Sequence, residues 1–328
     1  MSTGSPTGLL VDSEAVVESV ELAPPEVVAR SPRQLFWRRF RGDRVACAAA
    51  AFVVVLIVVA IAAPLVVKLL GLPGPNTQDP SATDAFGSPL GPTGAHPFGV
   101  DELGRDVLAR VIYGSRVSLE VGILGTALAA AVGTALGLMA GYYRGWVDAL
   151  ISRTIDVFLA FPVLVLGLGI GAACGVRGCL SGLVQPGITT VLFIIAMSTF
   201  TYIARIVRGQ VLSLREKEFI KAARLLGAST SRILCREILP NLVAPLVVYS
   251  SLLIPQNILL EASLSFLGVG IRPPTASWGQ MISEASPIFN TAWWYIVFPG
   301  LALLFTVLAF NLVGDGLMDA LNPRADAR

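Results

Sequence analysis

The sequence predicts an all-α membrane protein with six transmembrane helices. Of its 328 residues, 54% are hydrophobic and only 14% are charged, whereas a soluble domain carries about 25% charged residues. The apolar residues lie in blocks long enough to cross the hydrocarbon core of a bilayer, which takes about 20 residues. Backbone polar groups in lipid must be paired within their own segment, so these blocks are expected to be helices.

The six predicted spans are separated by more polar segments. The spans lie near residues 45–70, 117–142, 149–173, 188–207, 242–269 and 293–313. Residues 1–43 precede the first span, are polar and end beside a cluster of arginines. This composition predicts a largely disordered tail followed by an anchor that sets the membrane orientation.

The distribution of Lys and Arg predicts that both termini are cytoplasmic. With the N-terminus inside, 18 of the 24 Lys and Arg residues fall on the inner side and six on the outer side. Positive residues near the ends of spans are retained in the cytoplasm. The net charge of only +2 gives no reason to expect a nucleic-acid partner.

Residues 71–115 are predicted to form an extracytoplasmic loop with one interfacial helix. The stretch 71–97 is rich in Gly and Pro, which favours a loop. Asp101 is in position to cap a helix that runs to about Tyr113 and has an apolar side. We expect this helix to lie on the outer face of the membrane.

Small and helix-breaking residues mark three of the spans. The second span has a small residue at every fourth position, which allows a neighbouring helix to approach one face closely. These residues are Gly125, Ala129, Gly133, Gly137 and Gly141. Glycines 167, 169 and 171 are expected to loosen the third span, and Pro245 and Pro255 to kink the fifth.

Asp156 and Glu261 are acidic residues inside predicted spans, where charge is costly and a functional role is the default expectation. Asp156 is near enough to the inner end of its helix to reach the interface. Glu261 is about 19 residues into the fifth span, toward the outer surface. The structural alternative is that Glu261 pairs with an outer arginine such as Arg116 or Arg272.

No catalytic or metal-binding motif is evident. The chain lacks the G-x-x-x-x-G-K-[ST] loop, so it should not bind ATP by that device. Its single histidine, His96, cannot build a triad or a multi-His metal site, and Cys47 and Cys235 lack metal-ligand spacing. Cys174 and Cys179, on the expected outer side, are predicted to form a disulfide. The alternative is that they are two independent small residues.

A basic segment between the fourth and fifth spans, KAARLLGASTSRILCREILPN at 221–241, predicts two short helices with a tight elbow. Gly227 is expected to end the first helix, and Ser229 to cap a second one that stops before Pro240. Such a knuckle could enter a groove on another protein. It could instead lie on anionic lipid headgroups. A DNA-reading role is disfavoured because both ends are tethered to the membrane.

The same segment resembles the cytoplasmic loop motif of ABC-importer permeases, E-A-A, three residues, Gly, nine residues, I-x-L-P. The Ala-Ala, Gly and Leu-Pro spacing holds, but Lys221 replaces the usual Glu and Ile238 falls one place late. Four more stretches are similar to the dipeptide/oligopeptide/nickel permease family, and in particular to its C-type subunit. They are HPFGVDELGRDVLARVIYGSRVSLEVG at 96–122, EASLSFLGVG at 261–270, PPTASWGQM at 273–281 and PGLALLFTVLAFNLVGDGLMDALNPR at 299–324.

The resemblance implies the type I ABC importer permease fold in the bacterial cytoplasmic (inner) membrane. The expected parts are a first helix at 44–70, a five-helix permease core at 116–316 that includes a coupling loop at 208–241, and a cytoplasmic tail at 317–328. The implied partners are a homologous second permease, two ATPase subunits that bind ATP and Mg, and an extracytoplasmic substrate-binding protein. This chain would be a non-catalytic subunit without a cofactor of its own, surrounded by membrane lipid.

The resemblance also assigns an expected docking role to residues of the 221–241 segment. The residues expected to dock on the ATPase are Lys221, Ala222, Ala223, Arg224, Gly227, Ala228, Ser229, Leu239 and Pro240. The candidates for the translocation path or gate are Asp156, Asn257, Glu261 and Ser265. Di- or oligopeptides are the expected substrates, with nickel or another small solute as the alternative. An ion-coupled secondary transporter is disfavoured because it would need an intramembrane coupling site.

Overall fold

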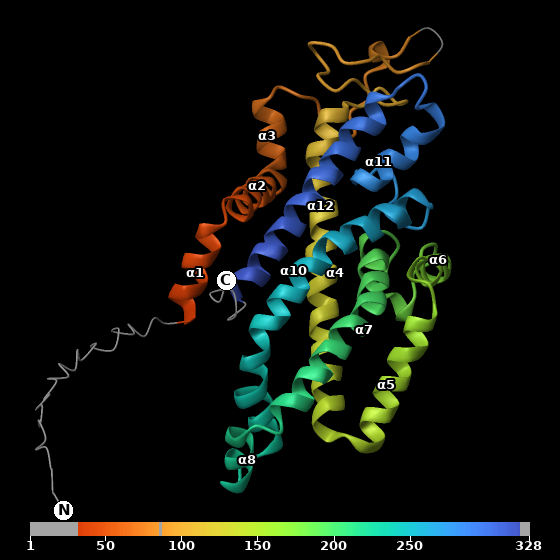
Figure 1. The fold of residues 1–328 in the computed structure, drawn as a ribbon. Helices are drawn as coiled ribbons and strands as arrows, with labels where there is room; N and C mark the ends of the chain where they lie inside the picture. Colours follow the sequence, from red (N-terminus) through yellow and green to blue (C-terminus); the bar gives the residue numbers. More distant parts are fainter. Residues whose placement is uncertain (1–31, 85–86, 322–328) are drawn as a thin grey trace, which may run out of the picture.

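The computed structural model describes residues 32–84 and 87–321, and within these ranges the regular elements are helices (Figure 1). Residues 1–31 and 322–328, which include most of both predicted tails, lie outside the described residues. The prediction of a largely disordered segment up to residue 43 is wrong for its last part, because α1 (Pro32–Gly42) is a helix. This helix packs against the C-terminal part of α12 (Trp294–Leu321).

The predicted first span is two helices, α2 (Arg44–Ile61) and α3 (Ala63–Leu69). Asp43 caps α2 by accepting hydrogen bonds from the amides of Val45 and Ala46 at 2.9 and 3.0 Å. The break falls at Ala62, just before Pro64 in the first turn of α3. Proline has no N–H to continue the preceding ladder but fits the start of a new helix, which explains the division.

The second span begins ten residues earlier than predicted, since α4 is one 37-residue helix, Val107–Tyr143. Asp106 caps it by accepting from the Ala109 amide at 2.7 Å, so the predicted cap at Asp101 and the separate interfacial helix are wrong. Nothing between Val107 and Val117 breaks a helix, and the two predicted segments therefore join. A helix of this length extends about 55 Å and exceeds the apolar core of a bilayer, about 30 Å thick.

The glycine face of α4 packs against α7 (Ile188–Leu214), which confirms the predicted close approach. A Cβ atom added to Gly133 would lie 2.6 Å from the carbonyl oxygen of Phe200, and one added to Gly137 would lie 2.7 Å from that of Ala204. Distances this short are not tolerated, so only glycine allows the two backbones to lie so close.

The third span is a bent pair, α5 (Gly145–Ala160) and α6 (Val163–Cys174), whose axes differ by 91°. The break lies at Phe161 and Pro162, rather than at the glycines that were expected to loosen this span. Proline lacks the N–H for the ladder and disfavours a helical conformation in the residue before it, and Phe161 is extended with ψ of 132°.

The fifth span is uninterrupted by its prolines. α10 (Leu239–Phe266) contains both Pro245 and Pro255 inside one helix. A six-residue π-helical stretch, Ile233–Ile238, leads into it. After a loop and the short helix α11 (Trp278–Ala285), α12 forms the last span.

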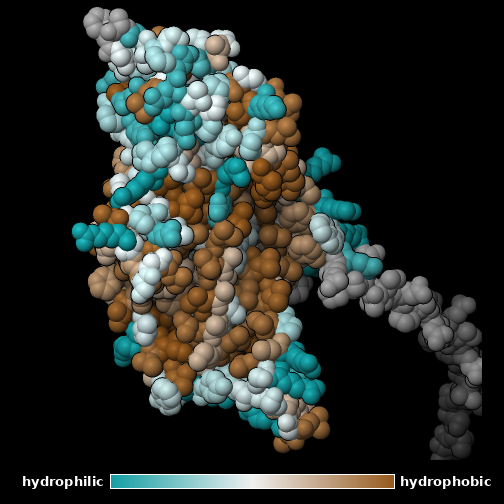
Figure 2. All heavy atoms as spheres, turned by 180° about the vertical axis from the view of Figure 1, so that it is seen from behind, coloured by the Kyte–Doolittle hydropathy of each residue, from teal (hydrophilic) through white to brown (hydrophobic). Residues whose placement is uncertain are grey.

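Five helices of the described residues are long and apolar enough to cross a membrane, and the bent α5–α6 pair makes a sixth candidate. Figure 2 shows an apolar band across one face of the molecule, with hydrophilic surface at both ends. The loop between α7 and α10 and the loop before α4 lie at opposite ends of the bundle (Figure 1). The predicted all-α membrane fold is confirmed.

Candidate functional site

The loop between α7 and α10 forms a knuckle at one end of the bundle. Helix α8 (Glu218–Leu225) is followed by Gly227, whose left-handed φ of +78° turns the chain out of the helix. The Ala228 amide donates to the Ala223 carbonyl at 3.0 Å and closes this helix end. This is the helix end that was predicted from Gly227. The predicted cap at Ser229 is also present, because its Oγ accepts from the Arg232 amide at 3.4 Å.

The second arm of the knuckle is not the short helix that was predicted. It starts at Thr230, passes through the π-helical stretch and continues into α10, so Pro240 lies in the first turn of a long helix. The Leu239 amide donates to the carbonyl of Leu234, five residues back. Proline fits where this wider pattern changes to the α-helical one, since no donor is needed there.

The knuckle is fixed to the bundle by one buried residue and by a group of basic side chains. Ile220 is fully buried in a cluster made by α7 and the second arm of the knuckle. Arg215 donates to the carbonyls of Gly141 and Tyr142, at the C-terminal end of α4. The Arg215 and Arg224 guanidinium groups lie 5.8 and 5.7 Å from the centre of the Tyr142 ring. These contacts hold the knuckle in a defined position.

The tip of the knuckle exposes two leucines. Leu225 and Leu226 are 90% and 87% exposed, and exposed apolar residues beside polar ones are typical of a surface that another protein covers. In the sequence, Phe219, Ala222, Ala223 and Leu226 recur at helical spacing, which predicts an apolar helix face that includes Leu226 but does not single out Leu225. The exposed tip could have been predicted from the two adjacent leucines that precede the helix-ending glycine.

The residues expected to dock on the ATPase divide into two groups. Most lie on the knuckle: Lys221, Ala222, Arg224, Gly227 and Ser229 are exposed, and Ala223 and Ala228 are half-buried. Leu239 and Pro240 instead lie in the first turn of α10, beyond the turn at Gly227.

The predicted partner of Glu261 is wrong, because hydroxyl groups surround it instead of an arginine. The Glu261 carboxyl group is completely buried and accepts from the Oγ atoms of Ser118 at 3.1 Å and Ser265 at 2.8 Å. The Oγ atom of Ser265 in turn accepts from the Ile271 amide at 3.0 Å. The cluster therefore joins α4, α10 and the loop after α10 within this chain.

Asn257 occupies a similar place one turn before Glu261. Its side chain donates to Thr126 of α4 at 2.8 Å and accepts from Thr199 of α7 at 2.9 Å. All three side chains are buried. Buried polar groups that are fully paired specify how helices pack, and this triplet links three of the spans.

Asp156 differs from the other three path candidates because it is exposed. Its carboxylate lies 3.0 Å from Nη2 of Arg205 on α7, and the two side chains are 51% and 59% exposed. The structure thus separates the path candidates into a buried set on α10 and one exposed ion pair on the α5–α7 face. Sequence reasoning did not identify Arg205 as part of this pair.

A buried ionic cluster anchors the loop before α4. Arg105 contacts Asp101 at 2.6 Å and Glu284 of α11 at 3.1 Å, and Arg110 of α4 contacts the same two carboxylates. Burial alone would lower the pKa of Arg105, but the two carboxylates outweigh it and raise that pKa. The guanidinium group therefore stays charged, and it ties this end of α4 to α11.

Cys174 and Cys179 are joined by a disulfide at the C-terminal end of α6, with their Cα atoms 4.9 Å apart. The bridge closes a small loop in which the Gly178 amide donates to the Cys174 carbonyl at 2.9 Å, and the Cys179 amide donates to the Val184 carbonyl in the segment that follows. Cys47 and Cys235 are free thiols. Among the described residues, no group of three His, Cys, Asp or Glu side chains could hold a metal ion.

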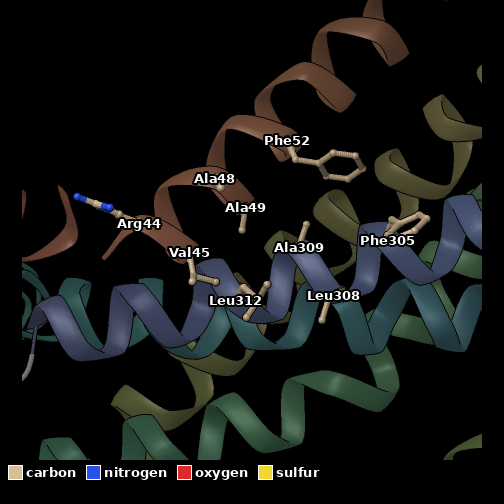
Figure 3. Close-up of a pocket in the computed structure, with 9 residues that line it drawn as sticks. All are labelled: Arg44, Val45, Ala48, Ala49, Phe52, Phe305, Leu308, Ala309 and Leu312. Carbon is tan, nitrogen blue, oxygen red and sulfur yellow. The ribbon is translucent and has the colours of Figure 1, made fainter. Parts of the chain in front are cut away.

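An apolar groove of about 370 Å³ lies between α2 and α12 (Figure 3). It is lined by Val45, Ala48 and Phe52 from α2 and by Phe305, Leu308 and Leu312 from α12, with Arg44 at one end. It offers almost no polar groups for a solute and lies on the two helices that flank one side of the bundle (Figure 1). Its composition suits lipid acyl chains.

Comparison with known proteins defines the class. Residues 133–327 match the family described as "Binding-protein-dependent transport system inner membrane component", and residues 31–92 match the "N-terminal TM domain of oligopeptide transport permease C". The chain belongs to the first of these families. It is a multi-pass inner-membrane permease subunit of a bacterial ABC importer, and a non-catalytic one.

Curated relatives match almost the whole chain. The "Glutathione transport system permease protein GsiD" of Shigella boydii serotype 4 (strain Sb227) is 43% identical over 311 residues, which cover 95% of this chain and 96% of the relative. The protein of the same name from Escherichia coli O157:H7 gives the same values.

Solved structures share the fold at low sequence identity. Two inward-facing forms of the MetNI methionine ABC transporter match with TM-scores of 0.54 and 0.52 at 16% and 17% identity. They cover 66% and 65% of this chain and 97% and 96% of the solved chains. These matches confirm the type I importer permease fold.

Proposed function

We propose that this chain is the C-type permease of an ATP-driven importer of short peptides. Its relatives include glutathione permeases, and glutathione is a tripeptide-like solute with free carboxylate and ammonium groups. The match of residues 31–92 to a domain of oligopeptide permeases points to the same substrate class. The chain would form half of the pathway, with a homologous permease forming the other half.

The observation that carries the proposal is the rigidly held knuckle with an apolar tip. Leu225 and Leu226 project from α8, while Ile220 and Arg215 fix its base to the bundle. We assign the surface of Lys221, Ala222, Ala223, Arg224, Gly227, Ala228 and Ser229 to docking on an ATPase subunit. The ATPase pair would bind ATP and Mg, and closure of that pair would shift the permeases between inward-open and outward-open states.

The proposed orientation puts the knuckle and both termini in the cytoplasm. The loop before α4 then lies outside, where a substrate-binding protein would deliver the peptide. The positive-inside bias of the sequence supports this arrangement.

Reconstitution tests the proposal. The chain, its partner permease and the ATPases are placed in liposomes, and the binding protein is added with radiolabelled glutathione. ATP should drive uptake of the peptide, and a Walker-type lysine substitution in the ATPases should abolish it. Uptake driven by an ion gradient without ATP, or uptake of nickel but of no peptide, would contradict the proposal.

A further inference from the structure

The α5–α7 face bears an ion pair in a place where lipid would not tolerate it. Asp156 lies ten residues beyond Trp146, an exposed aromatic residue near the start of α5, a distance of about 15 Å along the helix. Arg205 lies nine residues before the end of α7 at Leu214, a distance of about 14 Å. Both side chains are more than half exposed. Both residues lie toward the inner ends of the predicted spans 149–173 and 188–207, where a charged pair faces water or another protein instead of hydrocarbon.

A cavity of about 330 Å³ adjoins this pair at the elbow between α5 and α6. Its lining includes the aromatic residues Phe158, Phe161 and Tyr202, together with Pro162 and Ser198. Phe158 is two residues beyond Asp156 on α5, and Tyr202 is one turn before Arg205 on α7. Residues three apart on a helix share a face, so Tyr202 connects the cavity with Arg205 of the ion pair.

The elbow also exposes backbone carbonyl groups that would accept hydrogen bonds within a continuous helix. The last carbonyls of α5 have no following turn, because Phe161 and Pro162 are not helical and α6 leaves at 91°. Non-helical backbone within a membrane is tolerated where it is buried in protein or lines a polar cavity. The Phe158 carbonyl accepts from the Phe161 amide at 3.3 Å, and the other carbonyls of the last turn can accept hydrogen bonds from peptide N–H groups.

The neighbouring charges leave the pair available for a ligand. Arg208, one turn inward of Arg205, is held by both carboxylate oxygens of Asp148. Arg205 donates one hydrogen bond to Asp156, at 3.0 Å, on an open surface. A zwitterion can replace this one contact with two, an ammonium group on Asp156 and a carboxylate on Arg205.

We propose that Asp156, Arg205 and the elbow cavity form a transit site for zwitterionic short peptides. The inference rests on the proposed function and adds the place where the permease contacts its substrate. The peptide termini would engage Asp156 and Arg205, its side chains would contact Phe161 and Tyr202, and its amides would meet the open carbonyls of α5. Exposed charge pairs bind weakly, so a peptide held here could still leave the site.

Photo-crosslinking in the assembled, reconstituted transporter tests the site. A benzophenone amino acid replaces Tyr202 or, in a second variant, Phe161, and radiolabelled glutathione is imported with ATP. We expect label on this chain from at least one of the two positions. The control replaces Val54, an exposed residue of α2, and should capture lipid but no peptide.

The charge requirement is tested in the same assay. R205Q should lower peptide capture about fivefold, the effect of one lost exposed ion pair, and R144Q, which breaks the exposed Arg144–Glu216 pair at the inner end, should not. Uptake without capture at either position, or equal capture in R205Q and the parent, overturns the transit site and leaves the proposed function intact. Failure of the unmodified transporter to import glutathione overturns the proposed substrate instead, and the transit site with it.

Discussion

Ile220 and Leu225 lie five residues apart on α8 and occupy opposite environments, because Ile220 is fully buried and Leu225 is 90% exposed. The first residue attaches the knuckle to the bundle, and the second is left for a partner. Replacing Leu225 with Ser should therefore reduce ATP-dependent uptake about tenfold or more while the chain still folds and inserts. The measurement is uptake in proteoliposomes at matched protein levels.

Leu183, an exposed leucine of the loop after α6, provides the matched control. L183S should transport like the parent. Equal loss in L183S and L225S, or full uptake in L225S, would contradict docking through the leucine tip.

Substitution of Gly227 gives a second test of the knuckle, because it changes the backbone conformation without changing side-chain contacts. Its φ is +78°, and a Cβ atom there would meet nothing within 4 Å, so only the backbone conformation resists substitution. G227V should destabilise the turn by about 1–2 kcal/mol and reduce coupling of ATP hydrolysis to uptake. G227N, which tolerates the left-handed region, should stay close to the parent. Similar ratios of uptake to hydrolysis in the two variants would refute this role.

Glu261 is predicted to stabilise the packing of α4 and α10. E261A removes the acceptor for Ser118 and Ser265 and leaves a cavity, which should lower the free energy of unfolding by about 2–4 kcal/mol. E261Q keeps one acceptor oxygen and should lose clearly less. Thermal unfolding in detergent measures both. Arg116 is exposed, and the Glu261 carboxyl group is bound by serine hydroxyls, so R116Q should match the parent. A loss of stability in R116Q as large as that in E261A would support pairing with the arginine instead.

The native cysteines can report orientation and the disulfide together. In intact cells, an impermeant thiol reagent should leave exposed Cys235 unmodified, because it lies on the proposed cytoplasmic knuckle. Cys174 and Cys179 should react from outside only after an impermeant reductant has opened their bridge. Mass spectrometry identifies the modified residues. Labelling of Cys235 from outside would reverse the proposed topology, and labelling of Cys174 without reductant would show that the bridge is absent.

The sequence predicted which segments cross the membrane but not where the helices break. Proline illustrates the reason: Pro162 separates α5 from α6, whereas Pro245 and Pro255 remain inside α10. All three prolines lack the backbone N–H. Whether the helix breaks at a proline depends on the neighbouring helices that pack around it, and the sequence of a single segment does not show these neighbours. The join at residues 107–117 was missed because the segment before the second span was expected to form a separate interfacial helix that ends near Tyr113.

The knuckle was predictable because its signals are local, whereas the buried polar contacts were not. Gly227 and Ser229 act on amides and carbonyls within five residues of themselves. The partners of Glu261 include Ser118, 143 residues away, and its surroundings depend on which face of α4 turns toward α10. A search for opposite charges favoured arginine, but the available hydroxyl groups satisfied a buried carboxyl group instead.

The glycine face of α4 has a mechanical consequence. One end of α4 is tied to α11 by Arg105 and Arg110, and the other end is held by Arg215 at the base of the knuckle. Between these ends, α4 and α7 lie so close that neither can slide past the other without a clash. The two helices should therefore move as one rigid body. A tilt imposed at the knuckle should then produce the same tilt at the opposite membrane surface. Spin labels at the two ends of α4 should keep one separation throughout the ATP cycle.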